Sequence, residues 1–229
     1  MSYKTDNRIV LTLDAGGTNF VFSAIKGIQS IVEPVTLPSN GDNLDKCLQT
    51  ILDGFKTVIS KLNDKPVAIS FAFPGPADYP NGIIGDLGNL PSFRGGVALG
   101  PMLQEQFNLP VFINNDGDLF AYGEAIAGLL PEVNEMLEKA GNPKRYRNLF
   151  GITLGTGFGG GFVVNNQLYI GDNSAGAEIW LMRNGIDVYC FAEEGASIRA
   201  VQGVYHSNSR NKETETLSPK EIFDILEGK

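Results

Sequence analysis

Short apolar runs that end in polar or glycine-rich turns dominate the first part of the chain. Residues 9–13 and 20–25 are apolar enough for buried strands, and the glycine-containing segment 14–19 joins them. Residues 29–37 fit a further strand, so this region predicts a small antiparallel meander. From residue 42 to 62, apolar residues recur at the 3.6-residue spacing of a helix with one buried face.

The pattern then alternates between strands and helices. We expect buried strands at residues 66–73 and 110–114, a short helix at 102–107, and a loop rich in glycine, proline and asparagine at 77–96. An antiparallel start followed by helix, strand, helix and strand is typical of an α/β fold with a mixed sheet.

The second half repeats this organisation with fewer elements. A strand that enters a glycine turn and returns occurs in both halves, which we interpret as a structural repeat. We therefore expect two domains, residues 1–117 and residues 118–229, the second one incomplete at its C-terminal end. The elements expected in it are helices at 118–129, 131–140 and 192–205, strands at 148–154 and 162–170, a glycine turn at 155–161, a polar loop at 207–216, and a helix that starts at Ser218 with a capping-box pattern.

Composition excludes several classes of protein. Of the 229 residues, 42% are hydrophobic, which excludes disorder for the bulk of the chain. No apolar run approaches eighteen residues, and residues 1–8 are polar, so we expect neither a membrane span nor a secretory leader. The net charge of −8 argues against general affinity for nucleic acid, and two cysteines are too few for a disulfide scaffold. We expect a soluble, cytoplasmic protein with neither nucleic-acid nor membrane partners.

The turn after the first strand carries candidate phosphate and metal ligands. Gly16 and Gly17 would expose backbone N–H groups that can form an anion-binding nest. Asp14, at the strand end, is placed to hold a hydrated divalent cation such as Mg²⁺, and Thr18 and Asn19 offer further hydrogen bonds. An ordinary hairpin turn, for which adjacent glycines are common, explains the same residues equally well.

A second glycine-rich segment at residues 155–161 favours the phosphate interpretation. Gly155, Gly157 and Gly160 match the spacing G-x-G-x-x-G, but a dinucleotide fingerprint requires a helix next, and a strand-like run follows. The Gly-Lys-Ser/Thr of a Walker loop does not occur in the sequence. Two glycine hairpins in two α/β halves instead suggest a phosphate clamp between domains. The candidate phosphate ligands in this segment are Gly155, Thr156, Gly157 and Gly159.

Asp116 is the candidate general base. It follows the predicted strand 110–114, and ligands of α/β proteins bind at such strand ends. A carboxylate there could accept the proton of an attacking hydroxyl during phosphoryl transfer. The structural alternative is that Asp116 caps the following helix, but Asp118 is equally suited to capping.

These motifs occur together, and in the same order, in one known family. The chain resembles the ROK family of sugar kinases and repressors over nearly its whole length. The segments that carry the resemblance are Asp14 to Asn19, Pro74-Gly75-Pro76, Asn115-Asp116, Gly155 to Gly161, and Glu178.

The resemblance implies an actin-like ATPase fold, in which two ribonuclease-H-like domains with mixed sheets close on ATP and a hexose. It implies that Asp116 is the catalytic base. It also implies a set of sugar-binding residues, whose carboxylates and amides suit sugar hydroxyls. Those residues are Gly75, Asn89, Asn115, Asp116, Glu178 and Glu193.

The chain also departs from the family pattern. Trp180-Leu181 stand where the family has Gly-His, and a leucine cannot replace the hydrogen bonds of an imidazole. The cysteine-rich zinc motif is reduced to Cys190, and the only histidine is His206, so we expect no structural zinc. Because family members are longer, we expect C-terminal helices to be lacking, and a homodimer could cover the apolar faces exposed as a result.

Three functional hypotheses follow. The leading one is an ATP- and Mg²⁺-dependent sugar kinase that acts on a hexose or N-acetylhexosamine. A sugar-sensing transcriptional regulator is disfavoured, because eight residues before the first strand leave no room for a helix-turn-helix. A sugar-binding pseudokinase is favoured by the missing histidine and opposed by Asp14, Asp116 and the two glycine turns.

Overall fold

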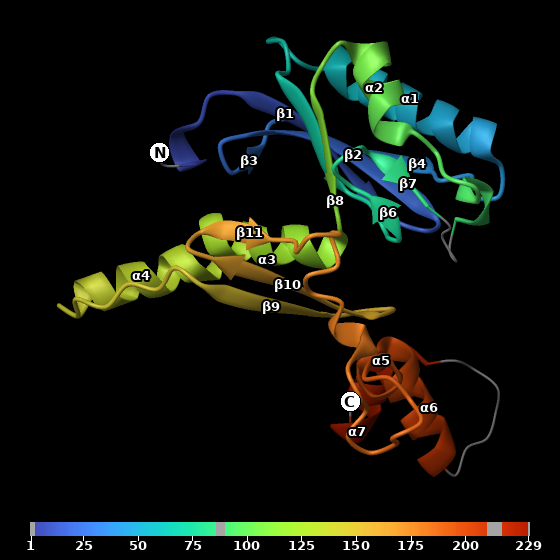
Figure 1. Ribbon diagram of the computed structural model, residues 1–229, viewed down its shortest axis with the longest axis vertical. Coiled ribbons are helices and arrows are strands. Elements are labelled where there is room, and N and C mark those ends of the chain that lie inside the picture. The colour runs from blue at the N-terminus through green and yellow to red at the C-terminus, as the bar shows by residue number, and fades with distance from the viewer. Residues whose placement is uncertain (1–2, 86–89, 210–216, 229) are drawn as a thin grey trace.

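Two β-sheets, one in each half of the chain, carry the fold of the protein (Figure 1). The computed structural model describes residues 3–85, 90–209 and 217–228. Its elements in chain order are η1 (Tyr3–Thr5), β1 (Ile9–Ala15), β2 (Asn19–Lys26), β3 (Gln29–Ser30), β4 (Val35–Pro38), α1 (Leu44–Ser60), β5 (Ala68–Ala72), β6 (Ala77–Asp78), β7 (Ile83–Ile84), η2 (Pro91–Phe93), α2 (Leu99–Phe107), β8 (Val111–Asn114), α3 (Asp116–Ile126), α4 (Leu129–Lys139), β9 (Leu149–Leu154), β10 (Phe158–Val164), β11 (Gln167–Tyr169), η3 (Ile179–Leu181), α5 (Glu193–Ala196), α6 (Ile198–Asn208) and α7 (Pro219–Leu226).

The first sheet is mixed, as the sequence predicts. It has six strands: β3, β2, β1, β5 and β8 follow one another, and β4 also pairs with β2. Strands β1 and β2 are antiparallel, whereas β1, β5 and β8 are parallel. The parallel strands place their carboxyl ends along one edge of the sheet, and in such folds that edge is where ligands bind.

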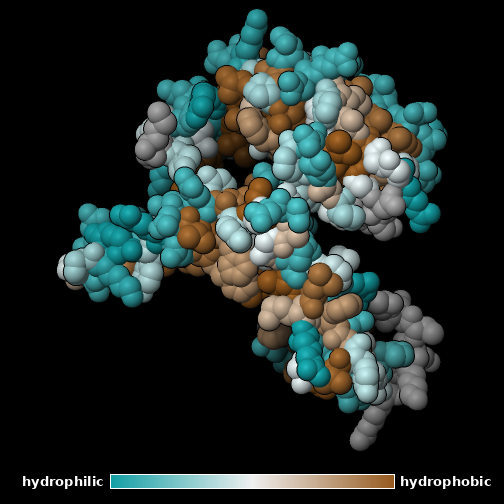
Figure 2. All heavy atoms as spheres, in the orientation of Figure 1, coloured by the Kyte–Doolittle hydropathy of each residue, from teal (hydrophilic) through white to brown (hydrophobic). Residues whose placement is uncertain are grey.

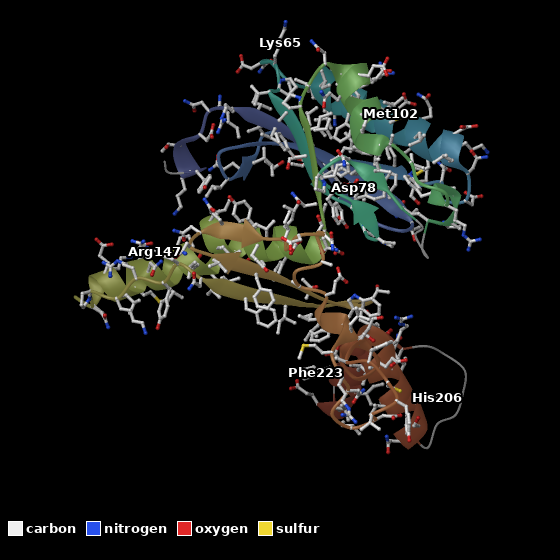
Figure 3. The ribbon with its side chains drawn as sticks, in the orientation of Figure 1. Lys65, Asp78, Met102, Arg147, His206 and Phe223 are labelled. Atoms are coloured by element: carbon white, nitrogen blue, oxygen red, sulfur yellow. The ribbon has the colours of Figure 1, made fainter. Side chains whose placement is uncertain are left out.

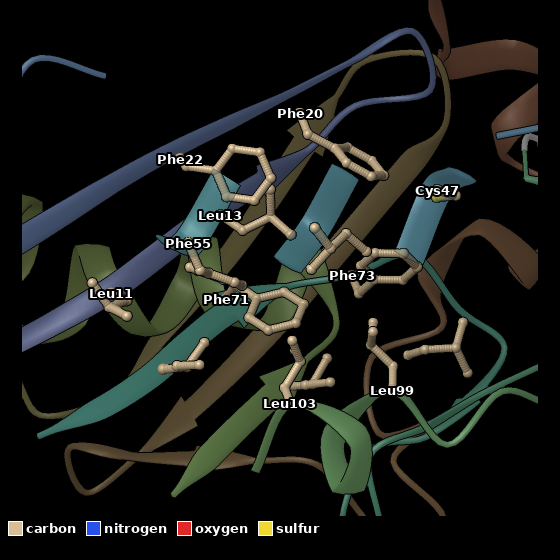
Figure 4. Close-up of a cluster of buried hydrophobic side chains, with 14 of the residues drawn as sticks. Leu11, Leu13, Phe20, Phe22, Cys47, Phe55, Phe71, Phe73, Leu99 and Leu103 are labelled. Carbon is tan, nitrogen blue, oxygen red and sulfur yellow. The ribbon is translucent and has the colours of Figure 1, made fainter. Parts of the chain in front are cut away.

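The core of the first half is built from phenylalanines between the sheet and α1 (Figure 4). Asn43 caps α1 by accepting a hydrogen bond from Lys46 N at 3.0 Å, and the apolar face of the helix buries Cys47, Phe55 and others. Any side chain at position 54 would meet the ring of Phe22, so Gly54 lets the helix lie close to β2. The predicted amphipathic helix is thus confirmed, and Cys47 lies in the core.

The second sheet is smaller, and one of its faces is covered by α3. Strand β10 lies between β9 and β11, and the chain runs from β8 into α3, which packs on β9 and β10 (Figure 1). A Cβ on Gly151 or Gly161 would lie 2.8 or 2.7 Å from the Cβ of Ala121. These glycines therefore permit the close approach of α3, and α5 to α7 follow as a separate helical group.

The structure corrects several predicted elements. The strand expected at 29–37 is two short strands, β3 and β4, which both pair with β2. The turn expected at 155–161 ends earlier, because β10 starts at Phe158. The strand expected at 162–170 is broken into β10 and β11 at Asn165 and Asn166, whose φ angles of 52° and 62° form a tight hairpin turn.

The helical segments also differ in detail. The helix expected at 192–205 is divided into α5 and α6 at Ser197, whose side chain accepts a hydrogen bond from Ala200 N at 3.3 Å and so starts a new helix. The capping box at Ser218 is confirmed, with Glu221 as its partner. Among the described residues, no helix has the length and apolar character needed to cross a membrane.

Candidate active site

The first sheet brings the first glycine turn close to the Asn115-Asp116 segment. Asp14 of β1 lies opposite Ala72 of β5, and Ala72 lies opposite Asn114 of β8. Because neighbouring strands are about 4.8 Å apart, the backbones of Asp14 and Asn114 are roughly 10 Å apart. Two distant sequence motifs therefore meet at one edge of the sheet.

Asn115, and not an aspartate, caps the helix that follows this edge. Its Oδ1 accepts hydrogen bonds from Gly117 N at 2.8 Å and from Asp118 N at 3.4 Å. Asp116 is the first residue of α3, is exposed, and accepts a hydrogen bond from Gly117 N at 2.9 Å through Oδ1. The helix N-terminus stabilises its negative charge. The carboxylate of Asp116 is thus accessible to a ligand at the sheet edge.

Three carboxyl groups lie near one another at this point. Asp118 is 5% exposed, and burial raises the pKa of its carboxyl to about 6, with further contributions from the charges of Glu178 and Asp116. Glu178 precedes η3 and accepts a hydrogen bond from the indole N–H of Trp180. The second half of the chain therefore adds a carboxylate to the edge formed by the first half.

The first glycine turn is anchored to the residue after β4. The buried hydroxyl of Ser39 donates to the carbonyl of Gly17 at 2.6 Å, and Ser39 N donates to the carbonyl of Thr18 at 2.9 Å. A Cβ on Gly16 would lie 2.8 Å from the carbonyl oxygen of Asn19, so the turn requires glycine there. Asp14 presents an exposed carboxylate beside this turn.

The residues around Asp14 fit a hydrated Mg²⁺. This ion is usually held by one or two carboxylates together with waters and substrate phosphates, and not by a cage of protein ligands. The described residues contain no group of three or more His, Cys, Asp or Glu side chains that could hold a metal by themselves. The absence of a structural zinc stays a prediction. The thiol of Cys190 donates a hydrogen bond to Asp187 at 3.4 Å, and this bond raises the pKa of the Cys190 thiol to about 11.

The second glycine turn is supported by the helices that follow it. Gly155 N donates to the carbonyl of Gly157 at 3.0 Å, and the Gly155 carbonyl accepts from Ile198 N at 2.9 Å. A Cβ on Gly155 would have no atom within 4 Å, so this side of the turn is open. Gly159, in contrast, lies inside β10, where a Cβ would be 2.5 Å from the hydroxyl of Thr153.

Glu193 lies against this second turn. Its Oε2 accepts a hydrogen bond from Phe158 N at 3.1 Å, and its Oε1 forms an ion pair with Arg199 at 2.7 Å. A groove of about 650 Å³ opens beside the pair. Its lining includes Trp180, Phe191, Ser197, Val204 and Ser207. The carboxylate of Glu193 thus has two protein partners, and its contact with a sugar stays a prediction.

The structure therefore groups the predicted site residues at two places. Asp14, Asn115, Asp116 and Glu178 gather around the sheet edge, together with Gly75, where a Cβ would lie 4.0 Å from Asn115 Nδ2. The turn 155–157 and Glu193 form the second place, and Asn89 lies outside the described residues. His206 lies on α6, far from the β6 strand marked by Asp78 (Figure 3).

Sequence reasoning missed Tyr79 and Arg199, and it considered Asp118 only as a cap. Tyr79 is buried, and its hydroxyl donates to the carbonyl of Phe73 at 2.9 Å. This bond spans six residues and depends on how the loop after β5 turns back, so no sequence motif could have revealed it. The charge of Arg199 and its six-residue distance from Glu193 were visible, but the bend at Ser197 that lets them meet was not.

The mixed sheet, the second sheet and the paired glycine hairpins define an actin-like ATPase fold. The chain belongs to the ROK family, whose model matches residues 10–227.

Known proteins of this family differ in what they do. A solved glucokinase from Parabacteroides distasonis ATCC 8503 is 60% identical with a TM-score of 0.90, and the match covers 100% of this chain and 64% of that one. The glucokinase of Thermotoga maritima is 30% identical over 74% of this chain and 49% of its own length. The N-acetyl-D-glucosamine kinase of Vibrio parahaemolyticus is 26% identical over 81% of this chain and 56% of its own length. The xylose repressor of Bacillus subtilis is 25% identical over 80% of this chain and 47% of its own length. The chain thus spans about half the length of the curated relatives it matches.

Proposed function

We propose that the protein transfers the γ-phosphate of ATP to a hydroxyl of a hexose or N-acetylhexosamine. The observation that carries the proposal is the exposed carboxylate of Asp116, which begins α3 at the sheet edge that also holds Asp14. Family membership and the names of the relatives, glucokinase and N-acetyl-D-glucosamine kinase, support the same activity.

Asp116 acts in this proposal as the general base. It accepts the proton of the sugar hydroxyl while the hydroxyl oxygen attacks the γ-phosphorus and the bond to the β-phosphate oxygen breaks. Asn115, Glu178 and Gly75 surround the sugar on the same side. Sugar hydroxyls both donate and accept hydrogen bonds, so an amide and a carboxylate together suit them.

The two glycine turns hold the phosphates in this proposal. The first turn, at 16–19, and the second turn, at Thr156 and Gly157, offer backbone N–H groups, and the open space beside Gly155 leaves room for an anion. When bound, Mg²⁺ would neutralise phosphate charge, and Asp14 would hold it through water. Closure of the two predicted domains, 1–117 and 118–229, would then align the reacting groups.

The test is sugar-dependent ADP release with Mg²⁺-ATP over a panel of hexoses and N-acetylhexosamines. Asp116→Asn keeps the shape of the side chain and removes its basicity, so kcat should fall by about 10²- to 10⁴-fold. Asp45→Asn is the matched control, because Asp45 is an exposed aspartate in the first turn of α1. Wild-type protein that releases no ADP with any sugar would refute the kinase, whereas an Asp116→Asn variant with full activity would refute Asp116 as its general base.

Sugar binding without phosphoryl transfer is the second candidate. Trp180 and Leu181 occupy the positions where the resemblance implies Gly-His, and xylose repressors are among the relatives. Calorimetric titration with the same sugars separates the two functions. Heat of binding without ADP release would favour a sugar-binding protein, whereas binding with turnover would favour the kinase.

A further inference from the structure

The indole of Trp180 connects the two places where the predicted site residues gather. Its N–H donates a hydrogen bond to Oε2 of Glu178, which belongs to the sheet edge. The same side chain lines the groove of about 650 Å³ that also borders Glu193 and Ser197. One aromatic side chain thus adjoins a predicted sugar ligand of each place.

The backbone next to Glu178 is tied to the first turn of α3 by close packing. Ile179 is 6% exposed, and a Cβ on Gly160 of β10 would lie 2.7 Å from its Cδ1. A Cβ on Gly117 of α3 would in turn lie 2.6 Å from the Gly160 carbonyl oxygen. The packing of η3 on β10, and of β10 on α3, therefore fixes the backbone of Glu178 relative to Asp116, which precedes Gly117 in the chain.

The indole is held from its other side by the segment that follows η3. The ring of Phe191 meets it edge-on, with ring centroids 5.8 Å apart and an interplanar angle of 73°. Ala192 N donates to the Met182 carbonyl at 2.7 Å, and Phe191 N donates to the carboxylate of Glu194 at 2.6 Å. Since Trp180 is still 36% exposed, the ring has a fixed place and also leaves surface that a ligand can cover.

We infer that Trp180 is a positioning residue for sugar binding, which acts through the carboxylate of Glu178. The terminal torsion of a glutamate is broad, so a carboxylate without a partner turns easily. The indole N–H holds Oε2 and leaves Oε1 of Glu178 to accept from other donors, because a carboxylate has about four lone-pair sites. This inference rests on the proposed function, because Oε1 is assigned to a hydroxyl of the bound sugar.

Trp180→Phe tests the inference directly, because it removes the N–H donor and keeps an aromatic ring against Phe191. Since a hydrogen bond to a charged group is lost, KM for the sugar should rise about three- to tenfold, with a smaller change in kcat and none in KM for ATP. Tyr189→Phe is the matched control, because it removes a donor from an aromatic side chain that is 95% exposed in the segment after η3. Unchanged KM for the sugar in Trp180→Phe would overturn the inference.

A double-mutant cycle tests whether Trp180 acts through Glu178. Glu178→Ala removes the acceptor of the indole N–H. In the Glu178→Ala background, Trp180→Phe should therefore change KM for the sugar by less than about twofold. Independent, additive effects of the two substitutions would overturn the inference.

The indole N–H can also be observed directly in protein without substrate. Trp180 is the only tryptophan of the chain, so its indole N–H gives a single signal in a ¹⁵N-correlated NMR spectrum. Glu178→Ala should move this signal to lower proton chemical shift, because the hydrogen bond to the carboxylate is lost. Glu105→Ala, at an exposed glutamate of α2, is the control. A signal that Glu178→Ala leaves unchanged would overturn the inference, and this measurement does not depend on the folding of Trp180→Phe.

Titration of wild-type protein with the sugar panel separates this inference from the proposed function. Bound sugar should shift the indole N–H signal of Trp180, since it meets the carboxylate that this N–H holds. ADP release with an unchanged signal at saturating sugar would support the kinase and overturn the inference. A shifted signal without ADP release would refute the kinase and support the inference, and calorimetric sugar dissociation constants would then replace KM for the variants. Neither ADP release nor a shift with any sugar would overturn both.

Discussion

The two halves of the molecule bury their sheets to very different extents. The first sheet packs against α1 and α2 over a large core that includes Phe22 and Phe55 (Figure 4). The second sheet buries one face under α3, with a small core around Ala121 and Val163. Its other face exposes Phe150, Ile152 and Leu154, and Figure 2 shows apolar surface over this half of the molecule.

This difference indicates where stability resides and where substitutions are tolerated. Burial of apolar surface is the main favourable contribution to folding, at about 25 cal/mol per Å². The first half therefore provides a rigid frame for Asp14 and Asn115. The second half contributes the second glycine turn and Glu178 from elements whose packing on one side is sparse.

Truncation of one phenylalanine in each half should show the largest contrast. Phe55 is fully buried, with ring centroids 5.2 Å from Phe22 and 5.9 Å from Phe107. Phe55→Ala should cost about 3–5 kcal/mol of unfolding free energy because it leaves a cavity. Phe150, 47% exposed and stacked on Phe162 at 4.5 Å, should cost about 1 kcal/mol or less.

Urea unfolding of both variants provides the measurement. Equal losses for Phe55→Ala and Phe150→Ala would contradict the comparison, since they would mean that the exposed face of the second sheet is covered in solution.

Substitution of two glycines of the second hairpin should have different effects, one on the packing of α3 and the other on ATP binding. A Cβ on Gly161 would lie 2.7 Å from both the Ala121 Cβ and the Gly117 carbonyl, so Gly161→Ala should push α3 from β10 and cost about 1–3 kcal/mol. Gly155 has open space beside it, so Gly155→Ala should leave the melting temperature unchanged and raise KM for ATP. Unchanged KM for ATP in Gly155→Ala would speak against phosphate binding by this turn.

The same glycines show how far sequence reasoning reached. Short apolar runs bounded by turns correctly identified β1, β2, β5 and β8, and the 3.6-residue spacing of apolar residues correctly identified α1. The run 159–161 was assigned to a turn because glycine is common in turns. Its actual role depends on Ile179, Ala121 and Gly117, which approach from elsewhere in the chain.

Sequence reasoning could place candidate residues that adjoin a strand end, and it could not place those that depend on long-range contacts. Asp14 and Asp116 each lie at or just after a strand end, so sheet geometry alone brings them to one edge. No pattern in the sequence links Ser39 to Gly17, because that bond follows from the packing of separate elements. The break between β10 and β11 was visible as an Asn-Asn pair, a residue type suited to positive φ.

The buried carboxyl of Asp118, which lies between the two halves, should lower the free energy of unfolding when it is ionised. Its pKa is raised from 3.8 to about 6, so between these pH values the folded protein binds more protons than the unfolded chain does. Stability should therefore fall as pH rises from about 4 to 6 and stay lower above that range. Asp118→Asn should remove this decrease and add about 1–2 kcal/mol at pH 7. Unfolding curves at pH 4 and 7 measure it, and Asp42→Asn, an exposed carboxylate, is the control.

The smallest effect is expected at α7, at the far end of the second half. Ser218 and Glu221 form a reciprocal capping box, and Gln202 of α6 donates to the carbonyl of Leu217 at 2.8 Å. Ser218→Ala should weaken the helix by about 1 kcal/mol, because the N–H of Glu221 loses its acceptor. Lys220→Ala should cost less, about 0.5 kcal/mol, because the pair of Lys220 with Asp224 is exposed to solvent.

Amide hydrogen exchange over residues 219–226 and over α1 shows whether Ser218→Ala destabilises α7 alone or both halves of the molecule. If the second half opens locally, Ser218→Ala should speed exchange in α7 and leave α1 unchanged, since α1 is protected by the core of the first half. Equal acceleration in both helices would mean that the two halves unfold as one cooperative unit. The sparse packing of the second sheet would then have no separate consequence for stability.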